Sequence, residues 1–130
     1  MVTRILILDY DGAAMQNAAR VLRQQGFEVI TVNNADTALA HVRERAPDLV
    51  LTEIVMHGKD GIECLLEIKR IAPQTKVVAM SGGVGMLTNE YVLYLAQRLG
   101  ADGTLAKPFT DEELSSAVRG ALDDPAGGAS

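Results

Sequence analysis

Hydrophobic residues along the chain fall into short continuous runs that alternate five times with amphipathic segments. The runs are five or six residues long, and they occupy residues 4–8, 27–32, 48–52, 76–80 and 102–106. Apolar runs of this length are typical of strands that are buried on both faces, as in parallel sheets. The last run, DGTLA, is weaker than the other four. We therefore expect five strands in one parallel sheet.

The segments between the runs predict helices, because their apolar residues recur at i, i+3, i+4 and i+7. The predicted stripes are Met15, Ala18, Ala19 and Leu22; Ala35, Ala38, Leu39 and Val42; Ile62, Leu65 and Leu66; Val92, Leu95, Ala96 and Leu99; and Leu114, Ala117, Val118 and Ala121. Thr110 and Glu113 have the spacing of a capping box, and Gly26 and Gly100 stand where helices should end. The alternation predicts an α/β fold of type (βα)5, a three-layer sandwich around a parallel sheet. We expect one domain over residues 1–122 and a flexible tail over 123–130.

Composition and charge narrow the range of partners. The chain has 130 residues and a formal net charge of −5. Its twelve Lys and Arg are scattered and it has no Trp, so we expect no nucleic-acid binding. No apolar run approaches the roughly 20 residues that span a bilayer, and the N-terminus does not resemble a signal peptide. A single cysteine, Cys64, excludes an internal disulfide, so we expect a cytoplasmic protein.

Polar side chains follow the predicted strands at their carboxyl ends. They are Asp9, Tyr10 and Asp11 after the first strand, Glu53 after the third, Ser81 after the fourth and Lys107 after the fifth. The carboxyl ends of parallel strands share one edge of the sheet, and binding sites of such folds lie there. Acids beside a lysine indicate a divalent cation, a phosphoryl group, or ion pairs in their place. We therefore expect a shared site at this edge.

Together these residues resemble the receiver domain of response regulators (CheY-like proteins), over residues 3–122. The matching features are LD at Asp9, the acid Glu53 followed by KDG at 59–61, Ser81 after VVAM, and KPF at 107–109. Each feature alone is weak, but their combination is specific. The resemblance implies a flavodoxin-like, CheY-like fold with strand order 2-1-3-4-5. It also implies a bacterial signalling protein of two-component phosphorelays that is not an enzyme.

The resemblance also assigns roles to the residues at the strand ends. In the family, an acidic pair after the first strand holds Mg2+ and an Asp after the third strand accepts a phosphoryl group. A Ser or Thr and a Lys then contact the phosphoryl oxygens. By position, these roles fall on Asp9 and Tyr10, on Glu53, on Ser81 and on Lys107.

Three departures from the family pattern argue against phosphorylation. The carboxylate of Glu53 lies one methylene, roughly 1.3–1.5 Å, further out than that of an Asp, and in-line attack tolerates a shift of about 1 Å poorly. Tyr10 is a neutral phenol at the metal position, and alternation along an extended chain aims Asp11 elsewhere. Thr104 stands where many members carry a switching aromatic residue. We expect no cofactor, and at most a weak Mg2+ site at Asp9, Asp11 and Glu53.

Two alternatives remain for Glu53. It pairs with Lys107 and partly imitates the phosphorylated state, with a charge of −1 against roughly −2 for a phosphoryl group. Otherwise it is a dead site that holds no particular conformation. In both cases the chain would be a stand-alone interaction module, with no effector domain on the same chain.

The expected partner is a sensor histidine kinase or another signalling protein. Leu87, Tyr91 and Tyr94 form a second apolar stripe, at i, i+4 and i+7, on the fourth predicted helix. An additional apolar face on a surface helix indicates a partner site. A homodimer through the fourth helix, fifth strand and fifth helix is the alternative to a heterologous partner.

The opening Asp9-Tyr10-Asp11-Gly12 also resembles the first motif of haloacid-dehalogenase-like phosphatases. In those Mg2+-dependent enzymes the first Asp is the nucleophile and the second is the acid and base. They need a further acidic pair after another strand, and the sequence predicts no sixth strand to carry it. Ala13 also stands where that family commonly has Thr or Val. A phosphatase that uses Asp9 and Asp11 is therefore the less favoured interpretation.

Overall fold

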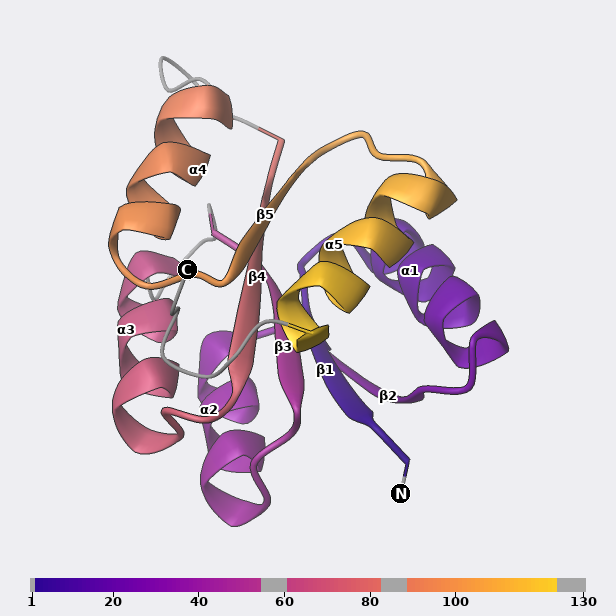
Figure 1. Ribbon diagram of the computed structural model, residues 1–130. Helices are drawn as coiled ribbons and strands as arrows, with labels where there is room; N and C mark the ends of the chain where they lie inside the picture. Colours follow the sequence, from indigo (N-terminus) through magenta and orange to yellow (C-terminus); the bar gives the residue numbers. More distant parts are fainter. Residues whose placement is uncertain (1, 55–60, 83–88, 124–130) are drawn as a thin grey trace.

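The computed structural model describes residues 2–54, 61–82 and 89–123, and its strands and helices alternate as the sequence predicts (Figure 1). The strands are β1 (Arg4–Leu8), β2 (Glu28–Val32), β3 (Leu49–Glu53), β4 (Lys76–Ser81) and β5 (Gly103–Ala106). The helices are α1 (Gly12–Gln24), α2 (Ala35–Glu44), α3 (Gly61–Ile71), α4 (Asn89–Arg98) and α5 (Asp111–Asp123).

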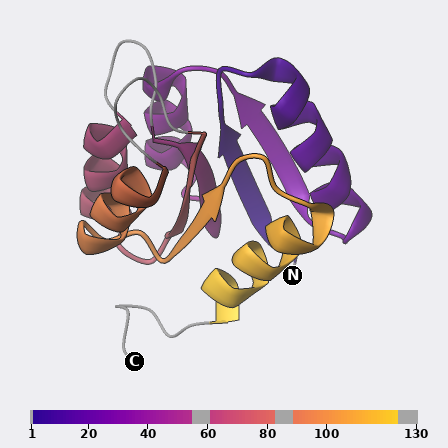
Figure 2. The same cartoon turned by 90° about the horizontal axis from the view of Figure 1, so that it is seen from above.

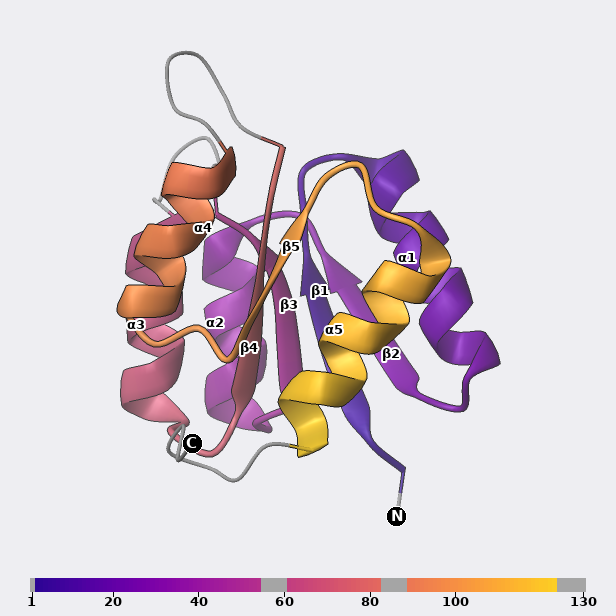
Figure 3. The same cartoon turned by 45° about the horizontal axis from the view of Figure 1, so that its top comes forward.

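The five strands form one parallel sheet in the order β2-β1-β3-β4-β5, which confirms the predicted topology (Figure 3). The order reverses at β1, because the chain moves from β1 outward to β2 and then returns to β3 on the other side. β1 and β3 are hydrogen-bonded neighbours, with Leu8 paired with Thr52. Asp9 and Glu53, which follow these two residues, therefore share one edge of the sheet.

Helices cover both faces of the sheet. Seen from above, α1 and α5 lie on one side, and α2, α3 and α4 lie on the other (Figure 2). Each side has its own hydrophobic cluster, one including Leu22 and Leu114 and the other including Leu39 and Leu65. All residues of β3 and β4 are buried. This burial on both faces explains why the sequence runs are continuous instead of alternating.

Two residues of the predicted stripes do not lie in the core. Leu66 is 45% exposed and Leu95 is 37% exposed. In α3 the buried face is centred on Cys64, Leu65 and Ile68, and a rotation of about 100° per residue turns Leu66 away from it. In α4 the core contacts come from Val92 and Ala96, which leaves Leu95 on a flank of the helix.

The predicted helix ends are confirmed where the structure describes them. The Thr110 hydroxyl accepts a hydrogen bond from the Glu113 N–H, and the Glu113 carboxylate accepts one from the Thr110 N–H. Gly26 and Gly100 have φ angles of 95° and 117°, a left-handed conformation that glycine adopts without strain. α5 includes Asp123, and the rest of the predicted tail lies outside the described residues. Within the described ranges, no helix is both long and apolar enough to cross a membrane.

Candidate functional site

One lysine bridges two buried carboxylates at the carboxyl edge of the sheet. The Nζ of Lys107 lies 2.6 Å from Oδ2 of Asp9 and 2.9 Å from Oε1 of Glu53. Asp9 follows β1, Glu53 ends β3 and Lys107 follows β5. The side chains of Asp9 and Glu53 are only 4% and 9% exposed. We call these three residues the Lys107 triad.

Each of the four carboxylate oxygens of the triad has a protein partner. Oδ1 of Asp9 accepts a hydrogen bond from the Asp11 N–H at 3.0 Å, and Oε2 of Glu53 accepts one from the Ile54 N–H at 3.0 Å. The other two oxygens contact Lys107. Hydrogen bonds to ionised groups are short and strong, so they hold both carboxylates in place. With all three groups ionised, the triad carries a charge of −1.

Lys107 stays protonated because its partners outweigh its burial. Burial lowers the pKa of Lys107, while the hydrogen bonds and the charges of Asp9 and Glu53 raise it. The net effect of these influences is that the pKa of Lys107 lies above its ordinary value of 10.5. The backbone of Lys107 is also anchored, because its N–H donates to the carbonyl of Ser81 at 3.0 Å. The ammonium group is therefore a permanent part of the site.

The two other residues after β1 do not add a carboxylate to the triad. Tyr10 is 41% exposed. Asp11 is the N-cap of α1, and its carboxylate accepts a hydrogen bond from the Ala14 N–H at 3.1 Å. In the described part of the chain, no cluster of three or more His, Cys, Asp or Glu residues could hold a metal ion.

The remaining predicted site residues lie on β4, β5 and α4 or outside the described residues. Ser81 is fully buried as the last residue of β4. Thr104 is exposed on β5. Tyr91 and Tyr94 are exposed on α4, at 56% and 60%. Leu87, the third member of that predicted stripe, lies outside the described residues.

The sequence did not predict that Lys107 contacts Asp9 as well as Glu53. It also did not predict a cavity next to this lysine. The cavity has a volume of about 390 Å³ and is lined by Asp11, Ala14, Asn17, Gly82, Lys107, Pro108 and Phe109. Its walls come from the first turns of α1 and from the segment after β5, which includes a cis peptide bond between Lys107 and Pro108. The one feature of the sequence that pointed to this place was the Lys-Pro pair after the fifth strand. The cavity itself could not be predicted, because its walls come from segments that are distant in the sequence.

The profile of the response regulator receiver domain family matches residues 5–119 of the chain. The chain belongs to this family. The resemblance predicted from the strand-end residues is thus confirmed, and the phosphatase interpretation finds no support. The receiver domain is a signalling module of two-component systems.

Known relatives and solved structures agree with this assignment. The DNA-binding response regulator MtrA of Mycobacterium tuberculosis (strain H37Rv) is 32% identical over 130 residues, which cover 97% of this receiver domain and 55% of MtrA. The DNA-binding transcriptional regulator NtrC of Azospirillum brasilense is 34% identical over 119 residues, 92% of this chain and 24% of NtrC. The chain thus spans about half the length of MtrA and about a quarter of the length of NtrC.

Two crystal structures show the same fold. The receiver domain of NtrX from Brucella abortus superposes with a TM-score of 0.86 at 34% identity, covering 93% of this chain and 99% of that one. A CheY-like receiver domain protein from Methanospirillum hungatei gives a TM-score of 0.85 at 25% identity, covering 95% of both chains.

Proposed function

We propose that this receiver domain acts as a protein-interaction module in two-component signalling without accepting a phosphoryl group. The observation that carries the proposal is the bridge from Lys107 to Glu53 and Asp9. The lysine that would contact a phosphoryl group in a receiver domain is already held by two carboxylates of the chain itself. The domain therefore works through binding, not through catalysis.

Charge opposes phosphorylation at Glu53. The triad already carries a charge of −1, and a phosphoryl group would add roughly −2 at a buried position, where like charges repel strongly. Receiver domains offset this repulsion with Mg2+, which requires nearly octahedral oxygen ligands. Here Tyr10 is a neutral phenol at the metal position, and Asp11 caps α1. These residues do not fit a magnesium ion, and we infer that the domain uses no cofactor.

The ion pair between Lys107 and Glu53 favours the view that Glu53 imitates a phosphorylated acceptor in part. A carboxylate 2.9 Å from Nζ occupies the lysine as a phosphoryl oxygen would, although with less charge. A dead site that holds no particular conformation would not need this contact. The domain then keeps one conformation that does not depend on a kinase reaction.

A protein partner follows from this mode of action. We infer that the partner is a sensor histidine kinase or another signalling protein. The DNA-binding activity named for MtrA and NtrC is not carried over, because the chain matches only part of those proteins. Cys64 is buried and is the one cysteine of the sequence, so no internal disulfide can form, which suits a reducing compartment such as the cytoplasm.

Incubation with acetyl phosphate and Mg2+, followed by intact-mass measurement, tests the proposal. We expect no gain in the mass of the wild-type domain. The matched variant Tyr10→Asp/Glu53→Asp restores both family residues, and we expect it to gain the mass of one phosphoryl group. A wild-type adduct that maps to Glu53 would refute the proposal.

A further inference from the structure

The cavity beside Lys107 shares only this lysine with the Lys107 triad. Its seven lining residues include neither Asp9 nor Glu53, whereas the Nζ of Lys107 contacts both of these carboxylates. A Cβ atom on Gly82 would lie 3.8 Å from Cβ and 4.0 Å from Cδ of Lys107, so the stem of the lysine runs along Gly82. Lys107 therefore contributes its methylene groups to the wall, while its charge is already paired in the triad.

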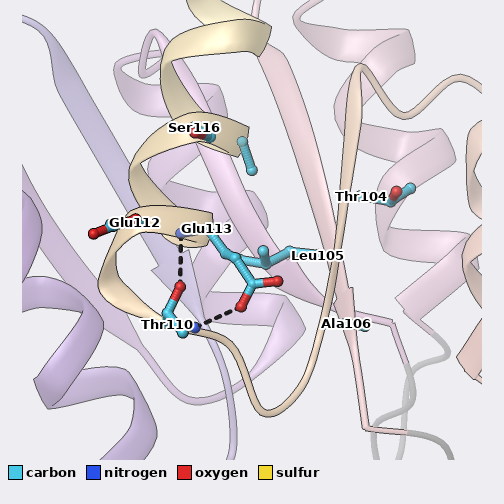
Figure 4. A pocket seen from close by; sticks show the side chains of 8 residues that line it. Thr104, Leu105, Ala106, Thr110, Glu112, Glu113 and Ser116 are labelled. Atoms are coloured by element: carbon cyan, nitrogen blue, oxygen red, sulfur yellow. Dashed lines mark hydrogen bonds between the residues drawn. The ribbon is translucent and has the colours of Figure 1, made fainter.

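The segment after β5 that forms one wall of the cavity is fixed at both of its ends. At one end, Lys107 donates its N–H to the carbonyl of Ser81 at 3.0 Å. At the other end, Thr110 follows Phe109 and makes the capping box with Glu113 that starts α5 (Figure 4). The wall is thus in place before any ligand binds, as in most small-molecule sites. The volume of about 390 Å³ also lies within the roughly 300–1,000 Å³ of such sites.

Two polar groups of α1 are open to a ligand in this cavity. The carboxylate of Asp11 accepts the Ala14 N–H through Oδ1, and its other oxygen has no hydrogen-bond or ion-pair partner among the described residues. Oδ1 of Asn17 accepts a hydrogen bond from Arg20 at 2.6 Å, which leaves the amide N–H groups of Asn17. The apolar part of the wall consists of Ala14, Pro108 and Phe109.

The charge around the cavity favours a cation as its occupant. Asp11 and the triad each carry a charge of −1, and together they outweigh the charge of Arg20 and the roughly half positive charge at the start of α1. The one cation among the lining residues is Lys107, and it is held by two carboxylates. A free anion such as phosphate is therefore disfavoured. A divalent metal ion is disfavoured as well, because Asp11 is the one carboxylate of the wall and such ions take about six oxygen ligands or more.

We propose that this cavity binds a small aromatic amine in its ammonium form. The ammonium group donates to the open oxygen of Asp11, as charge-assisted hydrogen bonds require. The aromatic body packs against Pro108 and Phe109, because aromatic rings attract each other in stacked or edge-to-face arrangements. This inference rests on the proposed function. The amine acts as a chemical input to a receiver domain that accepts no phosphoryl group, since the wall that it contacts carries Lys107.

The experiment is an NMR titration of the 15N-labelled domain with tryptamine, which is protonated at neutral pH. The matched probes are tryptophol, with a hydroxyl in place of the ammonium group, and indole-3-acetate, with a carboxylate. We expect tryptamine to shift the backbone amides of residues 11–17, 82, 107 and 109 and to saturate with a Kd of about 1 mM or tighter. Tryptophol should bind about three- to fivefold more weakly, because the pair with exposed Asp11 is partly solvated. Indole-3-acetate should bind most weakly of the three.

Two variants separate the charge of Asp11 from the shape of the cavity. Asp11→Asn keeps the helix cap and removes the charge, and we expect about three- to fivefold weaker binding of tryptamine. The control Asp36→Asn removes a carboxylate from the first turn of α2, on the opposite face of the sheet, and should bind like wild type. Ala14→Leu fills the cavity with a good helix former, and we expect at least about tenfold weaker binding of tryptamine and tryptophol alike. Unchanged amide shifts in α2 and β3 show that this variant is folded.

Three results would overturn the inference: no saturable shift below about 10 mM tryptamine, equal binding of tryptamine and indole-3-acetate, or full binding by folded Ala14→Leu. Equal losses in Asp11→Asn and Asp36→Asn would also contradict it. The mass experiment does not depend on this ligand. A wild-type adduct on Glu53 would refute the proposed function and leave the amine binding standing, whereas absence of amine binding would leave the mass result standing.

Discussion

Lys107 and Glu53 form an ion pair of 2.9 Å across the carboxyl edge of the sheet. Lys107 follows β5, the outermost strand of the sheet, whereas Glu53 ends the central strand β3. The ion pair therefore links the outermost strand to the central one. The same ammonium group also holds Asp9 after β1. The site of this receiver domain is thus filled by its own side chains.

Removal of the lysine charge should destabilise the fold. Lys107→Met leaves Asp9 and Glu53 as two buried carboxylates without their common cation. Breaking a buried ion pair on one side is strongly unfavourable. Because the Lys107 side chain is 18% exposed, we expect a loss of about 2–4 kcal/mol in the free energy of unfolding, somewhat less than the roughly 3–5 kcal/mol of fully buried pairs.

Urea denaturation at neutral pH measures this loss. The control is Arg98→Met, which removes a positive charge from an exposed position at the end of α4 and should change the stability by less than about 0.5 kcal/mol. Equal midpoints for Lys107→Met and wild type would show that the triad is not held together as described.

The stabilisation by Lys107 should be lost at alkaline pH. The pKa of Lys107 is raised above 10.5 in the folded domain, so the folded state binds this proton more tightly than the unfolded state does. The contribution is then fully present below the unfolded pKa and falls as the pH rises through the folded pKa. We expect the stability difference between wild type and Lys107→Met to be constant from neutral pH up to about pH 10 and to shrink above it. A stability difference between wild type and Lys107→Met that increases with pH would contradict this prediction.

The fold could be predicted because the apolar runs that form β3 and β4 are continuous, which only strands buried on both faces require. The meeting of Glu53 and Lys107 followed from their places after strands, since these ends share an edge. The contact between Lys107 and Asp9 could not be predicted, because it depends on side-chain conformations set by packing across three strands. Leu95 was misplaced because two apolar stripes overlap on α4, and the sequence does not show which one faces the core.

Asp11 should act as a helix cap and not as a metal ligand. Its carboxylate accepts the Ala14 N–H, and Asn serves as well as Asp at an N-cap, whereas Ala costs about 1 kcal/mol. We expect thermal unfolding of Asp11→Asn to match wild type and Asp11→Ala to be less stable by that amount. If Asp11→Asn instead abolished a stabilisation of the wild type by Mg2+, Asp11 would be a metal ligand.

Gly61 should tolerate no side chain at the start of α3. A Cβ atom there would lie 2.0 Å from the carbonyl oxygen of Ile54, which follows Glu53, so Gly61→Ala must displace backbone next to the site. We expect a loss of about 2–4 kcal/mol.

The matched control for Gly61 is Gly120→Ala in α5. A Cβ atom there meets nothing within 4 Å, and replacing a helical glycine by alanine should raise the stability by about 0.5–1 kcal/mol. Urea denaturation of both variants therefore should give shifts of opposite sign. Similar shifts for the two would mean that the contact between Ile54 and Gly61 does not constrain the fold.

A crystal structure of the domain soaked with Mg2+ and beryllofluoride tests most directly whether the Lys107 triad excludes a phosphoryl group. Beryllofluoride serves for this test because it imitates a phosphoryl group on a carboxylate. We predict that Nζ of Lys107 keeps its contacts with both Glu53 and Asp9, and that neither the metal ion nor the beryllofluoride is bound. Beryllofluoride bonded to the Glu53 carboxylate, with Mg2+ beside Asp9 and Lys107 turned toward the fluorides, would contradict the account.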